Sequence, residues 1–511
     1  MDRNEFESIP FIIRTFDTET DMSEVYFVDT TFRDGHASLW AEGMRTGMML
    51  PVASKMDQIG FKAMEVIATS HFLKCIRELR EDPWERIRLL SKRITKTPLA
   101  IMMGHNITAF DLSPFSVLKL WMERIAANGI KRVQLMDASN DISFRIPECV
   151  RFAKEAGLEV AVALIYCYSP RHTDEHYAQR TRDAARLGVD AIYLKDSGGL
   201  LTPERVQTLI PAILKNSDGI PVELHSHCTT GLAPLVYLEA VKSGMKTLHT
   251  AIPPLANGSS QPSILNISRN LRLMGHTPIL DEEAIHSISD HFMYIAKRER
   301  LPIGSPIEYD YYQYVHQVPG GVISNLKHQL SGLRMGDRLE EVLKEVIQIR
   351  KELGYPIMVT PFSQFVVSQA AMNVMVGERY KQVSDEVIKY TLGFWGKEAS
   401  SLVDPNINDK ILDLPRAREL SNWEPPQPSL REIREKLGGP GVSDDDLLLR
   451  CLSQEEEIRA MRSVSGPVKE YFTSRNPVVT LIRELCHQEN STYISIRKKD
   501  FSLTLQKNEK A

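Results

Sequence analysis

The sequence predicts an α/β protein built on a (β/α)8 barrel, and two observations support this fold. Short apolar runs rich in β-branched residues recur through the first half of the chain, and amphipathic helical patterns separate them. Strands that alternate with helices form a parallel sheet, and eight such units in about 250 residues are typical of a closed barrel. A doubly wound open sheet is the alternative.

The eight expected strands are short apolar runs rich in β-branched residues. In chain order they are VYFVDTT (25–31), AMEVIAT (63–69), LAIMMG (99–104), RVQLMDA (132–138), EVAVALIY (159–166), AIYLKDS (191–197), PVELHSH (221–227) and TLHTAIPP (247–254).

Helical patterns lie between these strands, at 44–60, 113–129, 142–157, 174–188 and 202–217. Several of them end at a glycine that can adopt the left-handed cap conformation. Thr202 and Pro203 are typical of a helix N-cap followed by a proline in the first turn.

Composition excludes several classes of protein. The chain has 511 residues, of which 42% are hydrophobic, so it can bury a large core. A net charge of −4 from 62 basic and 66 acidic residues offers no basic field for nucleic acid. The six cysteines form no Cys-x-x-Cys pair, the N-terminus lacks a signal-peptide pattern, and no apolar run is long enough to span a membrane. We therefore expect a cytoplasmic protein.

Polar residues at the strand ends mark a candidate site, because barrel active sites form where strands pass into the following loops. They are Asp34, Asn106, Asp137, Lys195, Asp196, His225 and His227. His225 and His227 share one face of a strand, so their imidazoles converge as in a metal site, although two ordinary strand-end histidines would give the same spacing. A lysine ammonium would repel a cation. Lys195 is an ion-pair partner of its neighbour Asp196, or, if a metal binds beside it, it must be in a neutral or anionic form.

Several segments resemble the biotin-dependent carboxyltransferase family, which includes the carboxyltransferase domain of pyruvate carboxylase, the oxaloacetate decarboxylase α-subunit and the transcarboxylase 5S subunit. They are DTTFRDGH (29–36), CIRELREDPWERIRLL (75–90), YLKDSGGLLTP (193–203), SSQPS (259–263), HQVPGGVISNL (316–326) and VTPFSQFVVSQAAMNVMVGERYK (359–381). The resemblance covers roughly residues 20–400, in order.

The resemblance implies a divalent metal, zinc, manganese or cobalt, held by Asp34, carbamylated Lys195, His225 and His227. It also implies catalytic roles for Arg33 near the substrate and for Thr360 as a proton relay. For Arg33 the alternative is a rim ion pair, and for Thr360 a turn residue before Pro361. Ser363 and Phe110 would contact biotin, and the substrate pocket would include His36, Ala37, Met103 and Phe362.

The pocket departs from the family pattern where pyruvate is held. Met103 replaces an arginine, Ala37 a glutamine, Phe110 a tyrosine and Phe362 a small residue. Losing these donors removes charge-assisted hydrogen bonds to a carboxylate, so we expect an acceptor other than pyruvate. His71 and His105, on altered loops, either supply polar contacts or are solvated loop histidines.

No biotinylation motif or ATP-grasp region occurs, so the expected partners are a separate biotin carboxyl carrier protein and a biotin carboxylase subunit, with this chain a homodimer in a larger complex. The expected segments are an N-terminal extension (1–22), the metal-binding barrel (23–300), a helical second domain that completes the active site (301–420), and a linker and tail (421–511). The tail either mediates assembly or packs on the barrel.

Three other functions remain open. The chain could be an oxaloacetate decarboxylase-type α-subunit, or a biotin-independent, metal-dependent Claisen-type lyase or synthase, which also uses an Arg-Asp-Gly segment and a His-x-His pair. A catalytically silent scaffold subunit is the third.

Overall fold

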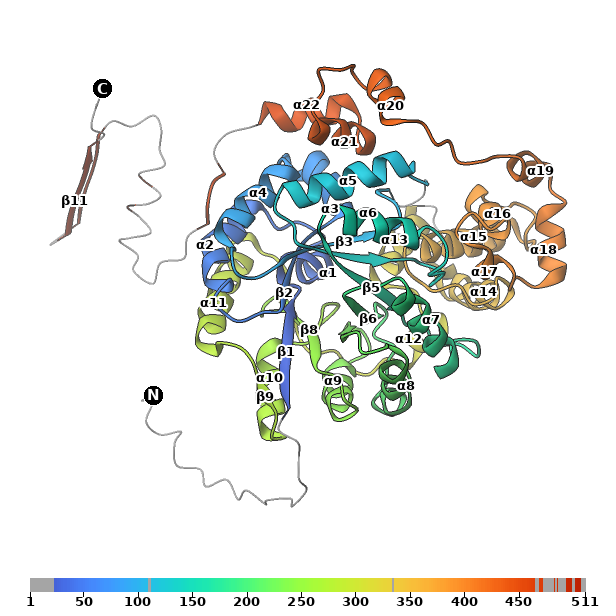
Figure 1. Ribbon diagram of the computed structural model, residues 1–511, viewed down its shortest axis with the longest axis horizontal. Coiled ribbons are helices and arrows are strands. Elements are labelled where there is room, and N and C mark those ends of the chain that lie inside the picture. Colours follow the sequence, from blue (N-terminus) through green and yellow to red (C-terminus); the bar gives the residue numbers. More distant parts are fainter. Residues whose placement is uncertain are drawn as a thin grey trace.

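The computed structural model describes residues 23–108, 112–332, 335–464, 468–471, 482, 485, 493–498 and 501–506. Eight parallel strands form a closed barrel, because β1 pairs with both β2 and β8 (Figure 1). They are β1 (Glu24–Asp29), β2 (Ala63–Ala68), β3 (Leu99–Gly104), β4 (Arg132–Met136), β5 (Glu159–Ile165), β6 (Ala191–Asp196), β7 (Val222–Ser226) and β8 (Thr247–Thr250). The closed (β/α)8 barrel is confirmed, and the open sheet is excluded.

Helices surround the barrel and bury their apolar faces against it. They are α2 (Thr46–Met56), α4 (Pro83–Arg93), α5 (Phe115–Ala127), α6 (Ile146–Glu155), α7 (Asp174–Arg186), α8 (Pro203–Asn216), α9 (Ala233–Lys242) and α10 (Ile264–Leu273), followed by α11 (Glu282–Glu299). Helix α8 begins as the sequence predicts, since the Thr202 hydroxyl accepts a hydrogen bond from the Arg205 amide at 3.1 Å. A short strand, β9 (Thr277–Pro278), pairs with the start of β1.

The chain leaves β1 through a buried π-helix, η2 (Thr31–Gly35), that continues into α1 (His36–Leu39). Such turns are rare in proteins and are frequent at functional sites. This one carries Arg33 and Asp34. A second π-helix, η3 (Cys75–Leu79), follows α3 (Thr69–Lys74) after β2.

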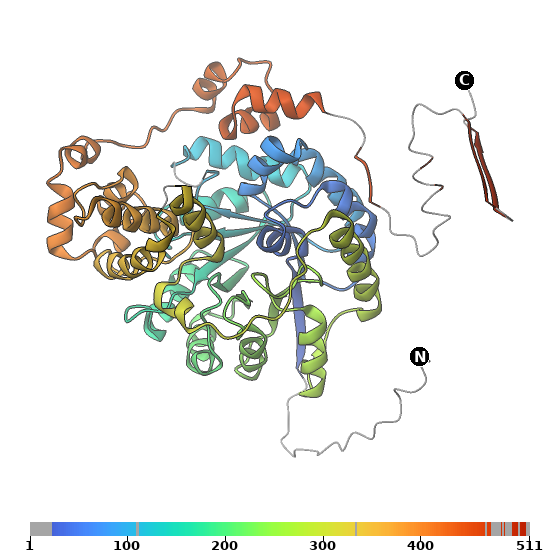
Figure 2. The same cartoon turned by 180° about the vertical axis from the view of Figure 1, so that it is seen from behind.

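A helical region follows the barrel and packs beside it (Figures 1 and 2). It contains α12 (Tyr311–His316), α13 (Gly320–Gly332), η4 (Gly336–Arg338), α14 (Leu339–Glu352), α15 (Phe362–Val376), α16 (Asp385–Thr391), α17 (Lys397–Ser400), α18 (Pro405–Leu412) and α19 (Pro415–Ser421). Its apolar core is continuous with small side chains of β5, Ala161 and Ala163. The exact domain boundaries stay predictions.

The C-terminal helices α20 (Leu430–Lys436), α21 (Asp444–Leu452) and α22 (Glu455–Ser463) lie over α4 and α5. Asp445 anchors them, because its carboxylate accepts hydrogen bonds from Arg124 Nε at 2.7 Å and Arg88 Nη1 at 3.2 Å. Of the two roles considered for the tail, this part packs on the barrel, while a role in assembly stays a prediction. A hairpin of β10 (Tyr493–Lys498) and β11 (Phe501–Gln506) follows.

Within the described ranges, we find no helix with the length and apolar character that crossing a membrane requires.

Candidate metal centre

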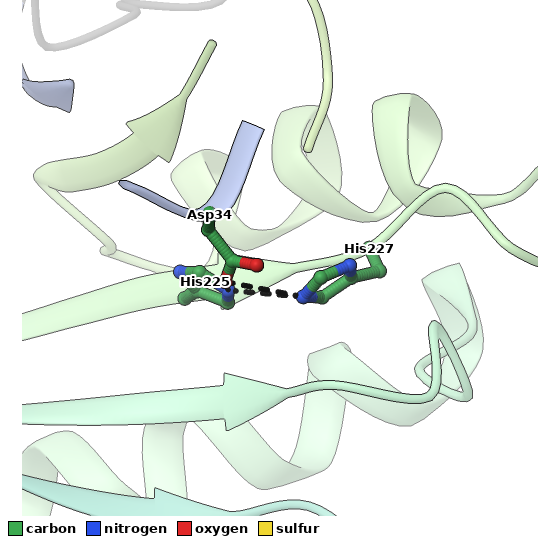
Figure 3. Close-up of side chains that lie close together, drawn as sticks. All are labelled: Asp34, His225 and His227. Carbon is green, nitrogen blue, oxygen red and sulfur yellow. Dashed lines mark hydrogen bonds and ion pairs between the residues drawn. The ribbon is translucent and has the colours of Figure 1, made fainter. Parts of the chain in front are cut away.

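Asp34, Lys195, His225 and His227 converge at the carboxyl ends of the strands. Lys195 and His225 are register partners on β6 and β7, with Nζ and Nε2 3.2 Å apart. One carboxylate oxygen, Asp34 Oδ2, lies 3.0 Å from His225 Nε2 and 3.4 Å from His227 Nε2 (Figure 3). The same oxygen lies 3.5 Å from Lys195 Nζ. The structure therefore brings together all four predicted ligands.

These four side chains suit a divalent metal by their chemistry. Asp34, His225 and His227 each offer one ligand atom, and the three atoms lie within 4.8 Å of one another. Imidazole nitrogens and carboxylate oxygens are common ligands of zinc and related ions. His225 Nε2 and His227 Nε2 lie 3.3 Å apart, and both face Asp34 Oδ2.

The local charges keep the candidate ligands in forms that can bind a cation. Burial would raise the pKa of Asp34, but Arg33, His227 and Lys195 outweigh it and hold that pKa well below its usual value. Burial and the neighbouring Lys195 hold the pKa of His225 well below its usual value, so this imidazole is neutral. Burial also lowers the pKa of Lys195, against the opposing effect of Asp34. A neutral amine is the form that can react with carbon dioxide.

Backbone and amide groups fix the second histidine. The Ser259 carbonyl accepts a hydrogen bond from His227 Nδ1 at 2.6 Å, which leaves Nε2 to face the centre. The Gln261 amide nitrogen lies 3.1 Å from His227 Nε2 and 3.3 Å from His225 Nε2, while its oxygen accepts from the Thr30 hydroxyl at 2.8 Å. Sequence reasoning did not assign a site role to Gln261, although it lies within the SSQPS segment that resembles the family.

Arg33 is held between two carboxylates. Its Nη1 lies 2.8 Å from Asp34 Oδ2, and its Nε donates to Glu65 Oε2 at 2.6 Å. The side chain is 4% exposed. The structure therefore shows the ion pair that was one of its two predicted roles, and contact with a substrate stays a prediction.

The four predicted pocket residues occupy different surroundings. His36 is buried beside His71, with ring centroids 4.9 Å apart and the rings tilted by 55°. Met103 is fully buried in the barrel core, and Ala37 is half-buried. Phe362 lies in the helical region, where its ring packs against Phe365, Tyr390 and Trp395 at 5.2–6.2 Å.

Neither His71 nor His105 is the solvated loop histidine considered above. His71 lies in α3 and is 1% exposed. His105 follows β3, is also buried, and places Nδ1 2.6 Å from Asp137 Oδ2. The carboxylate of Asp196 accepts hydrogen bonds from the Leu200 and Leu201 amides, both at 2.8 Å, and so holds the loop after β6 in place.

The residues predicted to act with biotin lie on other segments. Thr360 is exposed and lies just before α15. It therefore belongs to the helical region, whereas the four candidate ligands belong to the barrel. Ser363 is fully buried, and its hydroxyl has no hydrogen-bond partner among the described residues, so contact with biotin stays a prediction. Phe110 lies outside the described residues.

Comparisons with known proteins match both halves of the chain. Residues 24–291 match a family described as HMGL-like, and residues 314–496 match one described as a conserved carboxylase domain. A pyruvate carboxylase subunit of Methanocaldococcus jannaschii is 41% identical over 446 residues, which cover 86% of this chain and 78% of that protein.

A second relative and a solved structure agree with these matches. The methylmalonyl-CoA carboxyltransferase 5S subunit of Propionibacterium freudenreichii is 32% identical over 453 residues, covering 87% of this chain and 89% of that protein. The carboxyl transferase domain of Rhizobium etli pyruvate carboxylase, solved with oxamate and biotin, superposes with a TM-score of 0.78 at 24% identity, over 88% of this chain and 79% of that one. This superposition supports the fold. The chain belongs to the family of biotin-dependent carboxyltransferases.

Proposed function

We propose that this chain moves a carboxyl group between carboxybiotin on a separate carrier protein and a small-molecule acceptor, at a divalent metal held by Asp34, carbamylated Lys195, His225 and His227. The observation that carries the proposal is the convergence of these four side chains at one end of the barrel, with Asp34 Oδ2 3.0–3.5 Å from the other three. A metal bound there would polarise an acceptor oxygen and stabilise enolate-like negative charge.

The protein's own residues prepare this centre. Arg33 keeps Asp34 ionised, and the Ser259 carbonyl fixes the ring of His227. Lys195 supplies an amine whose pKa is lowered by burial, and a carbamate formed on it would add an anionic oxygen ligand. Thr360 is our candidate for passing a proton between biotin and acceptor, because a hydroxyl can both donate and accept one. Ser363 is our candidate for contact with biotin.

We further propose an acceptor other than pyruvate. A buried methionine stands at Met103 and a small side chain at Ala37, so neither can donate a hydrogen bond to an acceptor carboxylate. Pyruvate is the second candidate, since a relative 41% identical is named as a pyruvate carboxylase subunit. That relative's name, as one subunit of an enzyme, also supports a separate carrier and a separate biotin carboxylase as partners.

A biotin-independent lyase is less well supported. The HMGL-like match covers the barrel alone, whereas the conserved carboxylase domain accounts for residues 314–496. The four intact candidate ligands argue against a silent scaffold.

The test is reconstitution of the full chain with a carboxylated biotin carrier protein and a panel of small carbonyl and amide compounds. We expect acceptor-dependent loss of the carboxyl group from biotin, and we expect Asp34→Ala to abolish it. Transfer that continues unchanged in Asp34→Ala would contradict the metal centre. Transfer to pyruvate faster than to every other compound tried would contradict the acceptor proposal alone.

A further inference from the structure

A second group of charged side chains lies buried in the barrel directly behind His225. His249 on β8 stands beside His225 on β7, and their Nδ1 atoms are 3.2 Å apart. His249 Nε2 lies 3.0 Å from Glu223 Oε2, and His249 Nδ1 lies 3.1 Å from Glu65 Oε1. All four of these side chains are fully buried. His249 therefore connects one candidate ligand to two carboxylates.

This group has the composition of a second metal site, since Glu65, His225 and His249 offer ligand atoms within 4.8 Å of one another. Its one carboxylate, Glu65, already has other hydrogen-bond donors, however. Glu65 accepts hydrogen bonds from Arg33 Nε at 2.6 Å and from Gln134 Nε2 at 2.9 Å. A second ion would have to displace these donors, so the group is better explained as a support than as a metal site.

Glu223 is supported in a similar way, and both the ring and the backbone of His249 have fixed partners. Arg132 Nη2 donates to Glu223 Oε2 at 2.8 Å. Tyr193 stacks on the His249 ring at 5.6 Å with an interplanar angle of 11°, and the Tyr237 hydroxyl donates to the His249 carbonyl at 2.6 Å. Rotation of the His249 ring would break its stacking on Tyr193 and its contact with Glu223, so its Nδ1 occupies a fixed place beside His225.

We propose that His249 is a positioning residue for the metal ligand His225. His225 donates its Nδ1 proton to His249 Nδ1, which leaves the Nε2 lone pair of His225 directed at Asp34 and Lys195, and Glu223 holds His249 in place by accepting its Nε2 proton. This inference rests on the proposed metal centre. Histidine ligands generally use their second ring nitrogen in this way, and removing the partner typically lowers metal affinity by about 10- to 100-fold.

The test compares Co²⁺ binding by the full-length wild type, His249→Phe and His249→Gln. Phenylalanine keeps a ring to stack on Tyr193 but removes both nitrogens, whereas glutamine keeps one donor and one acceptor. We expect His249→Phe to lose Co²⁺ to a chelator at about 10- to 100-fold lower chelator concentration, and to show an altered visible Co²⁺ spectrum. His249→Gln should recover part of both properties.

His291→Phe is the matched control. His291 is also buried, and its Nε2 lies 2.8 Å from the Met48 carbonyl, in α11 on the outside of the barrel. This variant should keep the wild-type affinity and spectrum. If His249→Phe does not fold, Glu223→Gln leaves the histidine present while weakening its anchor, and we expect a smaller loss of Co²⁺ affinity.

The outcomes separate the two proposals. A wild-type chain that binds Co²⁺, together with a His249→Phe variant of equal affinity and identical spectrum, overturns the role of His249 alone. If His249→Phe does not fold, unchanged affinity in Glu223→Gln overturns that role in the same way. A wild-type chain whose Co²⁺ binding does not depend on His225, shown with His225→Ala, overturns the metal centre and this inference with it.

Discussion

Lys195 Nζ and His225 Nε2 lie 3.2 Å apart on adjacent strands, and both face the carboxylate of Asp34. A charged ammonium in this position would oppose the binding of a cation at the two histidines. Burial lowers the pKa of Lys195 and so favours the neutral amine, which is the form from which a carbamate can arise. A carbamate on Lys195 would replace this positive charge with an anionic oxygen ligand and so complete the proposed metal site.

The Lys195→Arg variant tests this modification. Arginine keeps the positive charge beside Asp34 but cannot form the carbamate, so we expect metal content to fall and carboxyl transfer to drop by about 100-fold or more. Native mass spectrometry should find one added carboxyl group on the wild type in bicarbonate and none on the variant. Lys215→Arg, at an exposed position in α8, is the control and should behave as wild type.

The Arg33→Met variant tests the ion pairs of η2. Arg33 contacts Asp34 and Glu65, and removing one partner of a buried pair typically costs about 3–5 kcal/mol because the remaining charges are left uncompensated. We expect the free energy of unfolding to fall by that amount in urea titrations. The control is Arg151→Met: Arg151 pairs with Glu148 and Glu155 on the exposed surface of α6, where solvent screens the pairs, so its loss should change the free energy of unfolding far less. Equal losses in the two variants would contradict the buried pairing.

Residues at the ends of the strands could be located from the sequence because each strand is a distinct apolar run. Once eight β-then-α units predict a barrel, Asp34, Lys195 and the histidine pair must lie at the same end. The observed strands and the convergence of these four side chains agree with that reasoning.

Contacts across the barrel could not be predicted in the same way. His249 is one polar position in TLHT, and its two carboxylates come from β2 and β7, so their meeting depends on barrel closure and strand register. The surroundings of Phe362 could not be predicted from its neighbours in the sequence either. Its place beside the Thr-Pro pair suggested a pocket, but its surroundings are set by Tyr390 and Trp395, which lie farther along the chain.

The Phe362→Ala variant separates a role in packing from a role in substrate binding. The ring packs against Phe365, Tyr390 and Trp395, and truncating a buried phenylalanine costs about 3–5 kcal/mol. We expect a loss of this size in the free energy of unfolding, with the KM for the acceptor nearly unchanged. Phe365→Ala, in the same cluster, should give the same pattern. A large rise in KM for Phe362→Ala alone would support the substrate-pocket prediction instead.

We expect the buried carboxyl group of Asp29, at the end of β1, to make the stability of the folded chain depend on pH. The carboxyl group is completely buried and accepts hydrogen bonds from the Thr31 amide at 3.2 Å and the Thr31 hydroxyl at 2.6 Å. Burial raises the pKa of Asp29 from 3.8 to about 8, because the two hydrogen bonds only partly offset the loss of solvation.

The sign of the effect follows from which state binds the proton. Between about pH 4 and pH 8 the folded chain keeps a proton on Asp29 that the unfolded chain has released, so rising pH favours unfolding. The contribution of Asp29 to the free energy of unfolding should therefore fall by at most about 1.4 kcal/mol per pH unit in this range and level off above about pH 8. Asp29→Asn cannot titrate, so its stability relative to wild type should rise from pH 5.5 to pH 8.

Urea titrations at pH 5.5, 7 and 8.5 measure this difference, and Asp57→Asn provides the control. Burial opposes ionisation of Asp57, but the backbone amides of Thr95, Thr97 and Lys96 outweigh it and lower its pKa. Asp57 is therefore ionised in both the folded and the unfolded chain throughout this pH range, so its replacement should lower stability by the same amount at each pH. If Asp29→Asn also shifts stability equally at all three values, Asp29 does not hold its proton in the folded state, and the carboxyl at the end of β1 must be ionised beside Glu65.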